Sequence, residues 1–219
     1  MTIALIPVKR LEQSKSRLLP QLADDQRQAL TLAMLEDLIE ALWGTEGIDR
    51  IAVTTPDPLV AERARAAGAE ILMRPEPGLN AALEAGIETL APGREEGVLI
   101  VLGDVAGALS EDFARLLAEA EKRAAPGVWL APSSDGGTCA LLQRPAGVIP
   151  CRFGRDSAKR HREACEAARV PHSEMRLASL SIDLDEPEDL EAFLATAKGG
   201  RRTRALLMAL AQAEKGGAH

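Results

Sequence analysis

Residues 98–104 read Val98-Leu99-Ile100-Val101-Leu102-Gly103-Asp104, five aliphatic side chains in a row followed by a glycine and an acid. A short aliphatic run without polar alternation is typical of a strand that is buried on both faces of a sheet. Working outward from this run, we expect further strands at 3–8, 51–55, 69–73 and 128–131, and one more that ends at Ile182-Asp183. Strands of this kind indicate a sheet covered by helices on both sides.

Amphipathic stretches separate these runs, and the spacing of their apolar residues predicts helices at 24–43, 60–67, 81–90, 110–124, 157–169, 187–197 and 203–213. The segment after Ala140-Leu141-Leu142 shows no regular pattern. Alternation of buried strands and helices predicts an α/β fold, a single-domain three-layer α/β/α sandwich with a mainly parallel sheet. We expect one domain over residues 1–215 and a frayed tail at 216–219. Ligands of such sheets bind at the carboxyl ends of the strands.

The overall composition narrows the class of partner. The net charge is −7, the pI is about 5.1 and aromatic residues make up 2% of the chain, so neither nucleic acid nor a membrane surface is an expected partner. The chain also lacks an apolar run of the roughly 20 residues that a membrane helix needs. The three cysteines lack paired spacing, so we expect no disulfide framework or zinc site, apolar packing roles for the thiols, and a reducing cytoplasm.

A basic segment follows the first expected strand and contains Lys9, Arg10, Lys15 and Arg17. Cationic side chains together with free backbone N–H groups suit a polyphosphate. The alternative is a solvated loop that happens to carry several charges. The glycines of a Walker loop or of a dinucleotide fingerprint are absent from this segment.

Acidic side chains stand at two other strand ends. Asp104 ends the run at 98–104, where an unpaired buried carboxylate would be costly, so it either caps a backbone group or faces a site. Asp183 and Asp185 are two residues apart on an extended segment and would share one face. Two carboxylates so placed favour a cation between them, and Mg²⁺ prefers such oxygen ligands. Alternatively, one of the pair caps the helix that begins at Pro187.

Small and hydroxyl-bearing residues gather in two later segments, Ser133–Thr138 and Arg152–His161. Small residues let the backbone approach a ligand, and hydroxyls at a helix start can bind an anion. Two plainer interpretations remain open: Ser157 is an ordinary helix N-cap, and His161 is a surface residue of its helix.

The order of these segments is more specific than any one of them. The chain carries Pro-Val-Lys-Arg-Leu with Lys-Ser-Arg-Leu at 7–18, Gly-Leu-Asn-Ala-Ala-Leu at 78–83, Gly103-Asp104, Gly137-Thr138, Arg-Phe-Gly with Ser and Arg-His at 152–161, and Asp-Leu-Asp-Glu-Pro-Glu-Asp-Leu at 183–190. This series resembles the 2-phospho-L-lactate guanylyltransferase family of deazaflavin coenzyme F-420 biosynthesis, over residues 3 to 195.

The resemblance implies a Rossmann-like nucleotidyltransferase fold of the nucleotide-diphospho-sugar transferase type. It implies Mg²⁺, GTP as donor, and 2-phospholactate, phosphoenolpyruvate or 3-phosphoglycerate as acceptor, with release of pyrophosphate. Matched residue by residue, the family's metal positions fall on Asp104, Asp183 and Asp185, and its acceptor positions on Thr138, Gly154 and Ser157. Its nucleotide-binding positions fall on Lys9, Lys15, Arg17 and Asn80. Lys15, Arg17 and Asp104 are the expected catalytic residues.

Two departures from the family border the expected acceptor site. Val105-Ala106-Gly107-Ala108 stands where relatives usually have a Leu-Pro pair, and Cys139 stands where many carry Asn. Rival interpretations are a molybdenum-cofactor or sugar-phosphate nucleotidyltransferase, although those families usually open with a glycine-rich loop, and a non-catalytic nucleotide-binding module. The apolar face of the closing helix is compatible with covering the core or with forming a homodimer.

Overall fold

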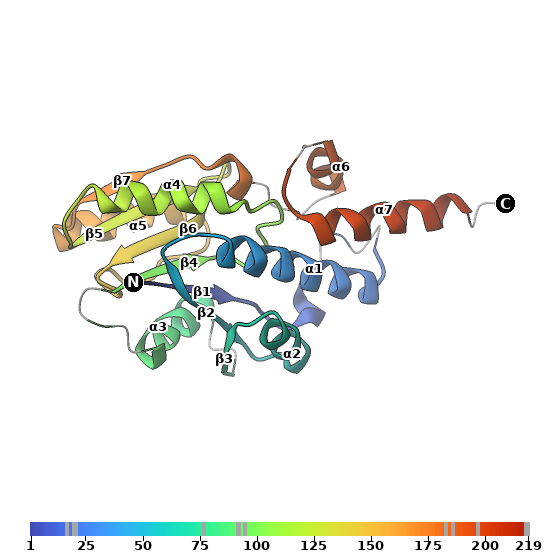
Figure 1. The fold of residues 1–219 in the computed structure, drawn as a ribbon, viewed down its shortest axis with the longest axis horizontal. Helices are drawn as coiled ribbons and strands as arrows, with labels where there is room; N and C mark the ends of the chain where they lie inside the picture. The colour runs from blue at the N-terminus through green and yellow to red at the C-terminus, as the bar shows by residue number, and fades with distance from the viewer. Residues whose placement is uncertain are drawn as a thin grey trace.

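The computed structural model describes residues 1–15, 18, 22–75, 78–90, 93, 96–181, 184, 187–195 and 198–216. Within these ranges one seven-stranded sheet runs in the order β3-β2-β1-β4-β6-β5-β7 (Figure 1). The strands are β1 (Thr2–Pro7), β2 (Ile48–Thr55), β3 (Glu70–Met73), β4 (Gly97–Val101), β5 (Gly127–Pro132), β6 (Thr138–Arg144) and β7 (His172–Glu174). Only β6 runs against the others among the described strands. The predicted mainly parallel α/β sheet is confirmed.

Helices cover both faces of the sheet, as the apolar strands require. One face packs against α1 (Asp24–Trp43), α2 (Pro58–Ala66) and α4 (Ser110–Glu121), with Leu38, Val60 and Phe113 in its core. The other face packs against α3 (Leu79–Leu90) and α5 (Ser157–Ala168), with Leu83 and Cys165 in its core. The three expected layers are therefore present (Figure 1).

Local sequence explains where α1 and α2 begin. The Gln26 side chain accepts a hydrogen bond from the Ala23 backbone N–H at 2.9 Å, and two acids occupy the first turn of α1. Asp57 accepts from the N–H groups of Leu59 and Val60 at the start of α2, and Pro58 occupies the first helical position. Both arrangements satisfy backbone donors that have no partner inside the helix.

The chain ends in α6 (Pro187–Ala195) and α7 (Arg201–Gly216), which lie beyond the carboxyl ends of the parallel strands (Figure 1). Leu207 of α7 and Phe193 of α6 join Leu30 and Met34 of α1 in a third apolar cluster. The closing helix therefore covers the chain's own core, which is one of the two uses its pattern left open.

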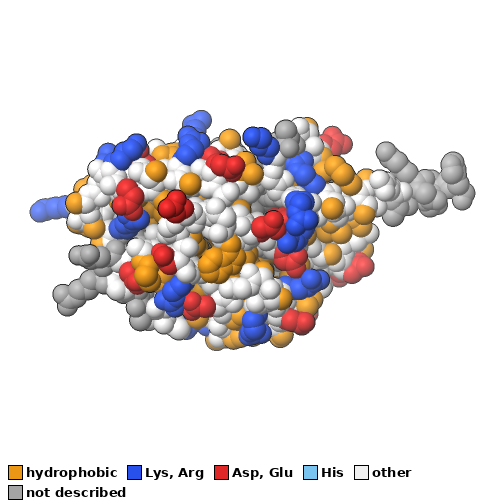
Figure 2. Space-filling model, in the orientation of Figure 1, with side chains coloured by type: hydrophobic (Ala, Val, Ile, Leu, Met, Phe, Trp, Pro, Cys, Tyr) orange, Lys and Arg blue, Asp and Glu red, His pale blue; other side chains and the backbone are white. Residues whose placement is uncertain are grey.

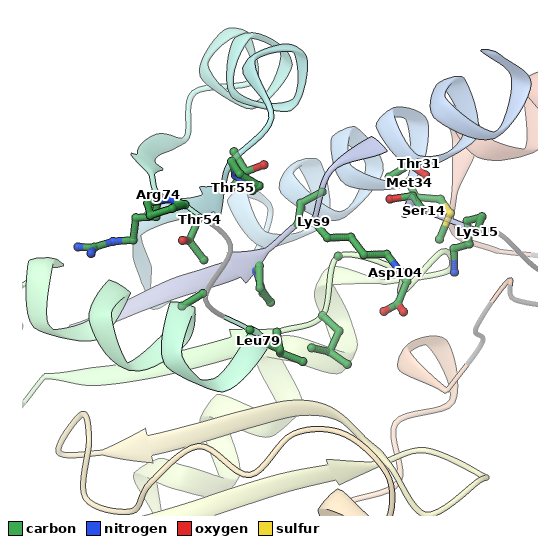
Figure 3. Close-up of a pocket in the computed structure, with 18 residues that line it drawn as sticks. Lys9, Ser14, Lys15, Thr31, Met34, Thr54, Thr55, Arg74, Leu79 and Asp104 are labelled. Atoms are coloured by element: carbon green, nitrogen blue, oxygen red, sulfur yellow. The ribbon is translucent and has the colours of Figure 1, made fainter. Parts of the chain in front are cut away.

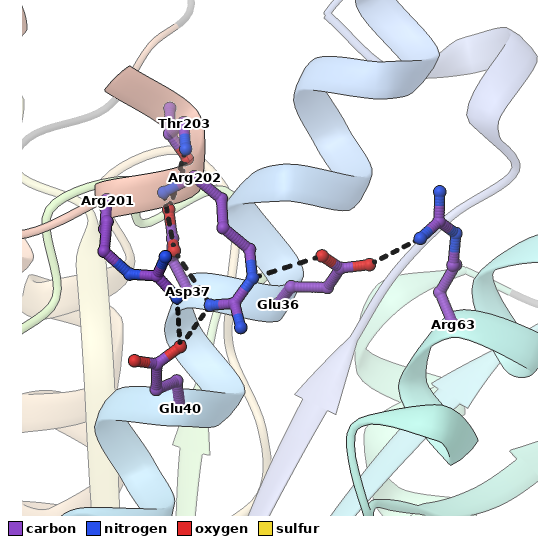
Figure 4. Close-up of polar contacts among 7 residues, drawn as sticks. All are labelled: Glu36, Asp37, Glu40, Arg63, Arg201, Arg202 and Thr203. Carbon is purple, nitrogen blue, oxygen red and sulfur yellow. Dashed lines mark hydrogen bonds and ion pairs between the residues drawn. The ribbon is translucent and has the colours of Figure 1, made fainter. Parts of the chain in front are cut away.

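The start of α7 is fixed to α1 by a buried carboxylate (Figure 4). Asp37 is 8% exposed and accepts hydrogen bonds from the backbone N–H groups of Arg202, at 3.0 Å, and Thr203, at 2.9 Å. The Thr203 hydroxyl donates to the same carboxylate at 2.9 Å. A side chain of one helix thus satisfies the second and third N–H groups of another, which is the usual task of a local N-cap.

Strand β6 corrects the expectation of an irregular segment after Leu142, because the strand continues to Arg144. The buried Gln143 interrupts the apolar run, and its side chain accepts a hydrogen bond from the Ile149 N–H at 3.1 Å. The pairing with β5 also shifts register: Ala131 lies opposite Ala140, but Pro132 lies opposite Thr138. Cys139 is therefore the extra residue of a β-bulge.

The prediction of a strand that ends at Ile182-Asp183 is wrong for the residues that precede Ile182 and are described. Residues 178–180 form a 3₁₀ turn, Ala178–Leu180, and the last strand of this region is β7, at His172–Glu174. Ile182 and Asp183 lie outside the described residues.

None of the described helices is long and apolar enough to cross a membrane. On the face shown in Figure 2, Lys and Arg side chains are interspersed with Asp and Glu.

Candidate active site

A cavity of about 370 Å³ opens at the carboxyl ends of β1, β2 and β4. The order β2-β1-β4 makes this the point at which the chain changes its direction of winding, where open α/β sheets bind ligands. Lys9, Lys15 and Asp104 lie at one end of the cavity, and Thr54, Thr55 and Arg74 at the other (Figure 3). The floor between them is apolar and includes Val8 and Leu79.

A glycine allows Asp104 to reach this cavity. A Cβ atom on Gly103 would meet the Val8 Cγ2 atom at 2.9 Å and the Pro7 carbonyl oxygen at 3.0 Å. Only glycine allows the segment after β4 to pass so close to the segment after β1. This close approach explains Gly103-Asp104 in the sequence and brings the carboxylate beside Lys9 (Figure 3).

The basic segment after β1 is held from two sides. On one side, the Asp57 carboxylate accepts a hydrogen bond from the Leu11 N–H at 3.0 Å. On the other side, Arg27 of α1, 4% exposed, donates to the Ser14 carbonyl oxygen at 2.6 Å and to Asp24 at 2.6 Å. Lys15 follows with a backbone φ of +52°, a conformation that costs energy for a residue other than glycine. Because Lys15 is 6% exposed and lines the cavity, the segment is not a solvated loop with stray charges at this residue.

The predicted metal site is described only in part. Asp104 is the sole acid among the described residues that line the cavity, and no group of three His, Cys, Asp or Glu side chains suited to a metal ion occurs in the described portion of the chain. Asp183 and Asp185 lie outside that portion, as does Arg17. Leu184, between the two aspartates, is fully buried in the same cluster as Ala106.

A second polar group lies beside the cavity, where β6 meets α5. The Ser157 hydroxyl donates to Thr138 Oγ1 at 3.1 Å, and His161 Nδ1 lies 3.1 Å from the same oxygen. The Arg152 N–H donates to His161 Nε2 at 3.0 Å. The group is connected to the cavity through the backbone of β6, because the carbonyl oxygen of Cys139, the residue after Thr138, accepts a hydrogen bond from the N–H of Leu102, a lining residue.

Two plainer interpretations of this group are wrong. His161 is 0% exposed and is not a surface residue, because its ring turns inward and packs edge-on against Phe153. Ser157 is not the N-cap of α5, since Asp156 holds that position and the Ser157 side chain bonds to Thr138 instead. The β-bulge accounts for the contact: Ala140 and Leu142 face the α1 side of the sheet, whereas Thr138 meets α5 on the opposite face.

Asn80 and Gly154 shape the rim between the two regions. Asn80 Nδ2 donates to the Phe153 carbonyl oxygen at 3.1 Å, and the Phe153 N–H donates to Asn80 Oδ1 at 2.8 Å. The amide thus ties the segment before α5 to the start of α3, where Leu79 lines the cavity. Gly154 has a φ of +114°, which a residue with a Cβ would adopt only under strain. The structure therefore shows Asn80 positioning backbone, a role its sequence context did not reveal.

Burial sets the protonation state of two cysteine thiols and of the His161 ring. It raises the pKa of the Cys151 thiol to about 12 and that of the Cys165 thiol to about 11. These thiols are therefore neutral, and all three cysteines are buried in the apolar clusters, which confirms apolar packing roles for them. Burial, aided by the charges of Arg160 and Arg152, lowers the pKa of His161 to about 4, so its ring is neutral near pH 7.

Sequence reasoning missed several residues that build the site. Arg27 and Asp57 look like ordinary helix residues, and nothing in their spacing connects them to the basic segment. Thr54 and Thr55 gave the clearest unused signal, because two hydroxyls at the carboxyl end of a predicted strand face the same edge as Lys9.

Comparisons with known proteins agree with this geometry. A family model described as "Guanylyl transferase CofC like" matches residues 2–213. A phosphoenolpyruvate guanylyltransferase from Sphaerobacter thermophilus is 36% identical over 200 residues, 91% of this chain and 95% of that protein. A 3-phospho-D-glycerate guanylyltransferase from Colwellia psychrerythraea is 32% identical, over 87% of this chain and 90% of its own length.

Solved structures of lower sequence identity share the fold. A crystal structure from Desulfovibrio desulfuricans, assigned provisionally to the nucleotide-diphospho-sugar transferases, superposes with a TM-score of 0.72 at 20% identity. The match covers 95% of this chain and 96% of the other. This likeness concerns the fold and confirms the predicted nucleotide-diphospho-sugar transferase type.

Proposed function

The chain belongs to the family of CofC-like guanylyltransferases, and on that premise we propose that it transfers GMP from GTP to a small phosphorylated carboxylic acid with release of pyrophosphate. Phosphoenolpyruvate and 3-phosphoglycerate, named in its relatives, are the first acceptors to test, with 2-phospholactate as the third. The product would serve deazaflavin coenzyme F-420 biosynthesis in the cytoplasm. The observation that carries the proposal is the shared cavity of Lys9, Lys15 and Asp104 at the switch point of the sheet.

The cavity has the features that a nucleoside triphosphate needs. Its apolar floor at Val8 and Leu79 suits the faces of a purine, and Thr54 and Thr55 line it, although the Thr55 hydroxyl already accepts a hydrogen bond from the Asp57 N–H at 3.1 Å. Lys9 and Lys15, at the other end, would bind the phosphates and, with Arg17, neutralise the charge that develops on the departing pyrophosphate. The clamps from Arg27 and Asp57 keep the segment that carries Lys15 in place before GTP binds.

The residues present also fit a magnesium ion. Mg²⁺ is usually held by one or two carboxylates together with substrate phosphates, and Asp104 supplies such a carboxylate beside two lysines. Burial of Leu184 with Ala106 supports Asp183 and Asp185 as further ligands in this proposal, since both aspartates adjoin Leu184 in the chain. The ion, when bound, would polarise the α-phosphate.

The acceptor is proposed to bind beside Thr138, Gly154 and Ser157, next to the cavity. The phosphate of the acid is already ionised near neutral pH, so its oxygen can attack the α-phosphorus without a protein base. Positioning is then the main task of the chain. Asn80 contributes by fixing the segment that carries Gly154. A single chain carries these groups, and a homodimer would leave them unchanged if it used the exposed Met208 side of α7.

Pyrophosphate release measured with GTP and magnesium against a panel of the three acids tests the proposal. Asp104→Asn is expected to lower turnover at least 100-fold, because an amide cannot replace a carboxylate on a divalent cation. Asp49→Asn is a matched control, because Asp49 lies near the start of β2, at the end of the strand away from the cavity, and this variant should leave turnover unchanged. Release with CTP but not GTP, or equal turnover in the two variants, would refute the proposal.

A further inference from the structure

Three side chains that are almost fully buried form a hydrogen-bonded group outside the nucleotide cavity. His161 is 0% exposed, Ser157 1% and Thr138 2%. The Thr138 oxygen lies 3.1 Å from both of the other two groups. Buried polar atoms normally have all their hydrogen bonds satisfied, so the hydrogens of this group can be counted.

The backbone decides which nitrogen of His161 carries a proton. The Arg152 N–H points at Nε2 from 3.0 Å, so Nε2 must accept and cannot itself be protonated. A neutral imidazole then has its single hydrogen on Nδ1. The Nδ1–H group donates to the Thr138 oxygen.

This tautomer leaves one hydroxyl hydrogen over. The group contains three donors, namely His161 Nδ1–H and the hydroxyls of Thr138 and Ser157, but only two contacts join its members. Whichever way the Ser157–Thr138 bond runs, one of the two hydroxyls keeps a hydrogen that neither contact uses. Neither hydroxyl has another partner among the described residues. With the hydrogen on Nε2 instead, both hydroxyl hydrogens would be consumed and the pair could only accept.

We infer that His161 is a positioning residue that makes the Thr138–Ser157 pair a hydrogen-bond donor to an anionic oxygen of the acceptor. The inference rests on the proposed function, because it takes the neighbouring site to bind a phosphorylated acid. His161 does not touch that acid. It fixes the direction of the hydroxyl hydrogens, and so it favours a phosphate or carboxylate oxygen over a group that must itself donate.

Steady-state kinetics with GTP and the best acceptor of the panel separate this role from a structural one. His161→Leu leaves one hydroxyl hydrogen over but no longer fixes its direction, so it should raise the acceptor KM about 3- to 10-fold and leave the GTP KM within about twofold. His161→Asn keeps an N–H near the position of Nδ1 and should recover most of the acceptor KM. Cys165→Ala, one turn further along α5 and equally buried, should lower the melting temperature without changing the acceptor KM.

A double variant and a spectroscopic measurement complete the test. In a Thr138→Val background, His161→Leu should change the acceptor KM less than about twofold, because both act through one hydroxyl. Equal rises in both KM values, or additive effects in the double variant, would overturn the inference. Long-range ¹H–¹⁵N NMR of the wild-type chain reports the tautomer without any substrate. An Nε2–H ring at pH 7 overturns the inference even if the GMP transfer is confirmed, whereas an Nδ1–H ring with no pyrophosphate release faults the proposed function instead.

Discussion

Replacing Asp37 with alanine tests whether one carboxylate of α1 fixes the start of α7. Its two oxygens accept from the N–H groups of Arg202 and Thr203 and from the Thr203 hydroxyl, at 2.9 to 3.0 Å. Loss of an N-cap costs about 1 kcal/mol, and loss of buried hydrogen bonds to a charged group adds about 1.5 to 3 kcal/mol. We therefore expect a loss of about 2.5 to 4 kcal/mol in the free energy of unfolding. For a chain of this length that is a fall of about 5 to 12 °C in Tm.

Urea denaturation at pH 7 measures this change, and two further variants isolate its cause. Asp37→Asn keeps an acceptor oxygen without the charge and should lose about half as much stability. Glu36→Gln, one position earlier, breaks ion pairs to Arg63 and Arg202 that are partly exposed, and should cost less than about 1 kcal/mol. If Glu36→Gln costs as much as Asp37→Ala, surface charge rather than the buried cap holds α7, and the reasoning fails.

Two further expectations follow from buried groups of the site. Arg27→Met removes the hydrogen bond to the Ser14 carbonyl and should raise the GTP KM about tenfold with the acceptor KM unchanged. Lys122→Met, a control at an exposed ion pair, should change neither constant. An unaltered GTP KM in Arg27→Met would show that Arg27 does not hold the segment for GTP binding. Burial lowers the pKa of His161 from 6.5 to about 4. Between these pH values the unfolded chain binds a proton that the folded chain does not. The free energy of unfolding should therefore fall by up to about 3 kcal/mol as the pH drops through this window. Denaturation midpoints from pH 7 to pH 4 should show a smaller slope in His161→Asn, and equal slopes in both proteins would contradict the assigned shift.

Much of the fold followed from apolar periodicity alone. The helix expected at 24–43 is α1 with the same bounds, and the run at 98–102 is the central strand β4, displaced by one residue. Both predictions are confirmed because the spacing of apolar residues within one helix or strand reports which of its side chains are buried. Strand β6 was not among the predicted strands, because Gln143 interrupts its apolar run and looks like a surface residue, although a neighbouring loop satisfies its side chain in the core.

The location of candidate site residues was predictable where a charged side chain follows a strand, and not where a contact between elements decides the surroundings of the residue. Lys9, Lys15 and Asp104 share a cavity because parallel strands end at one edge. His161 was misread because Arg160 and Arg162, its neighbours, are charged and suggest a solvent-facing helix. Its burial depends on Thr138 and Arg152, which belong to other segments.

The extra residue in β6 makes the orientation of Thr138 depend on the register of this strand. If Cys139 took its place in the normal alternation instead of bulging, Thr138 would point at the α1 face, and its hydroxyl would lie among aliphatic side chains instead of beside Ser157. Cys139 itself packs into the α1-side core, so another residue of suitable size could take its place there. A change that lets Cys139 pair regularly with β5 would therefore move Thr138 away from Ser157, whereas exchanging Cys139 for a residue that keeps the bulge would not.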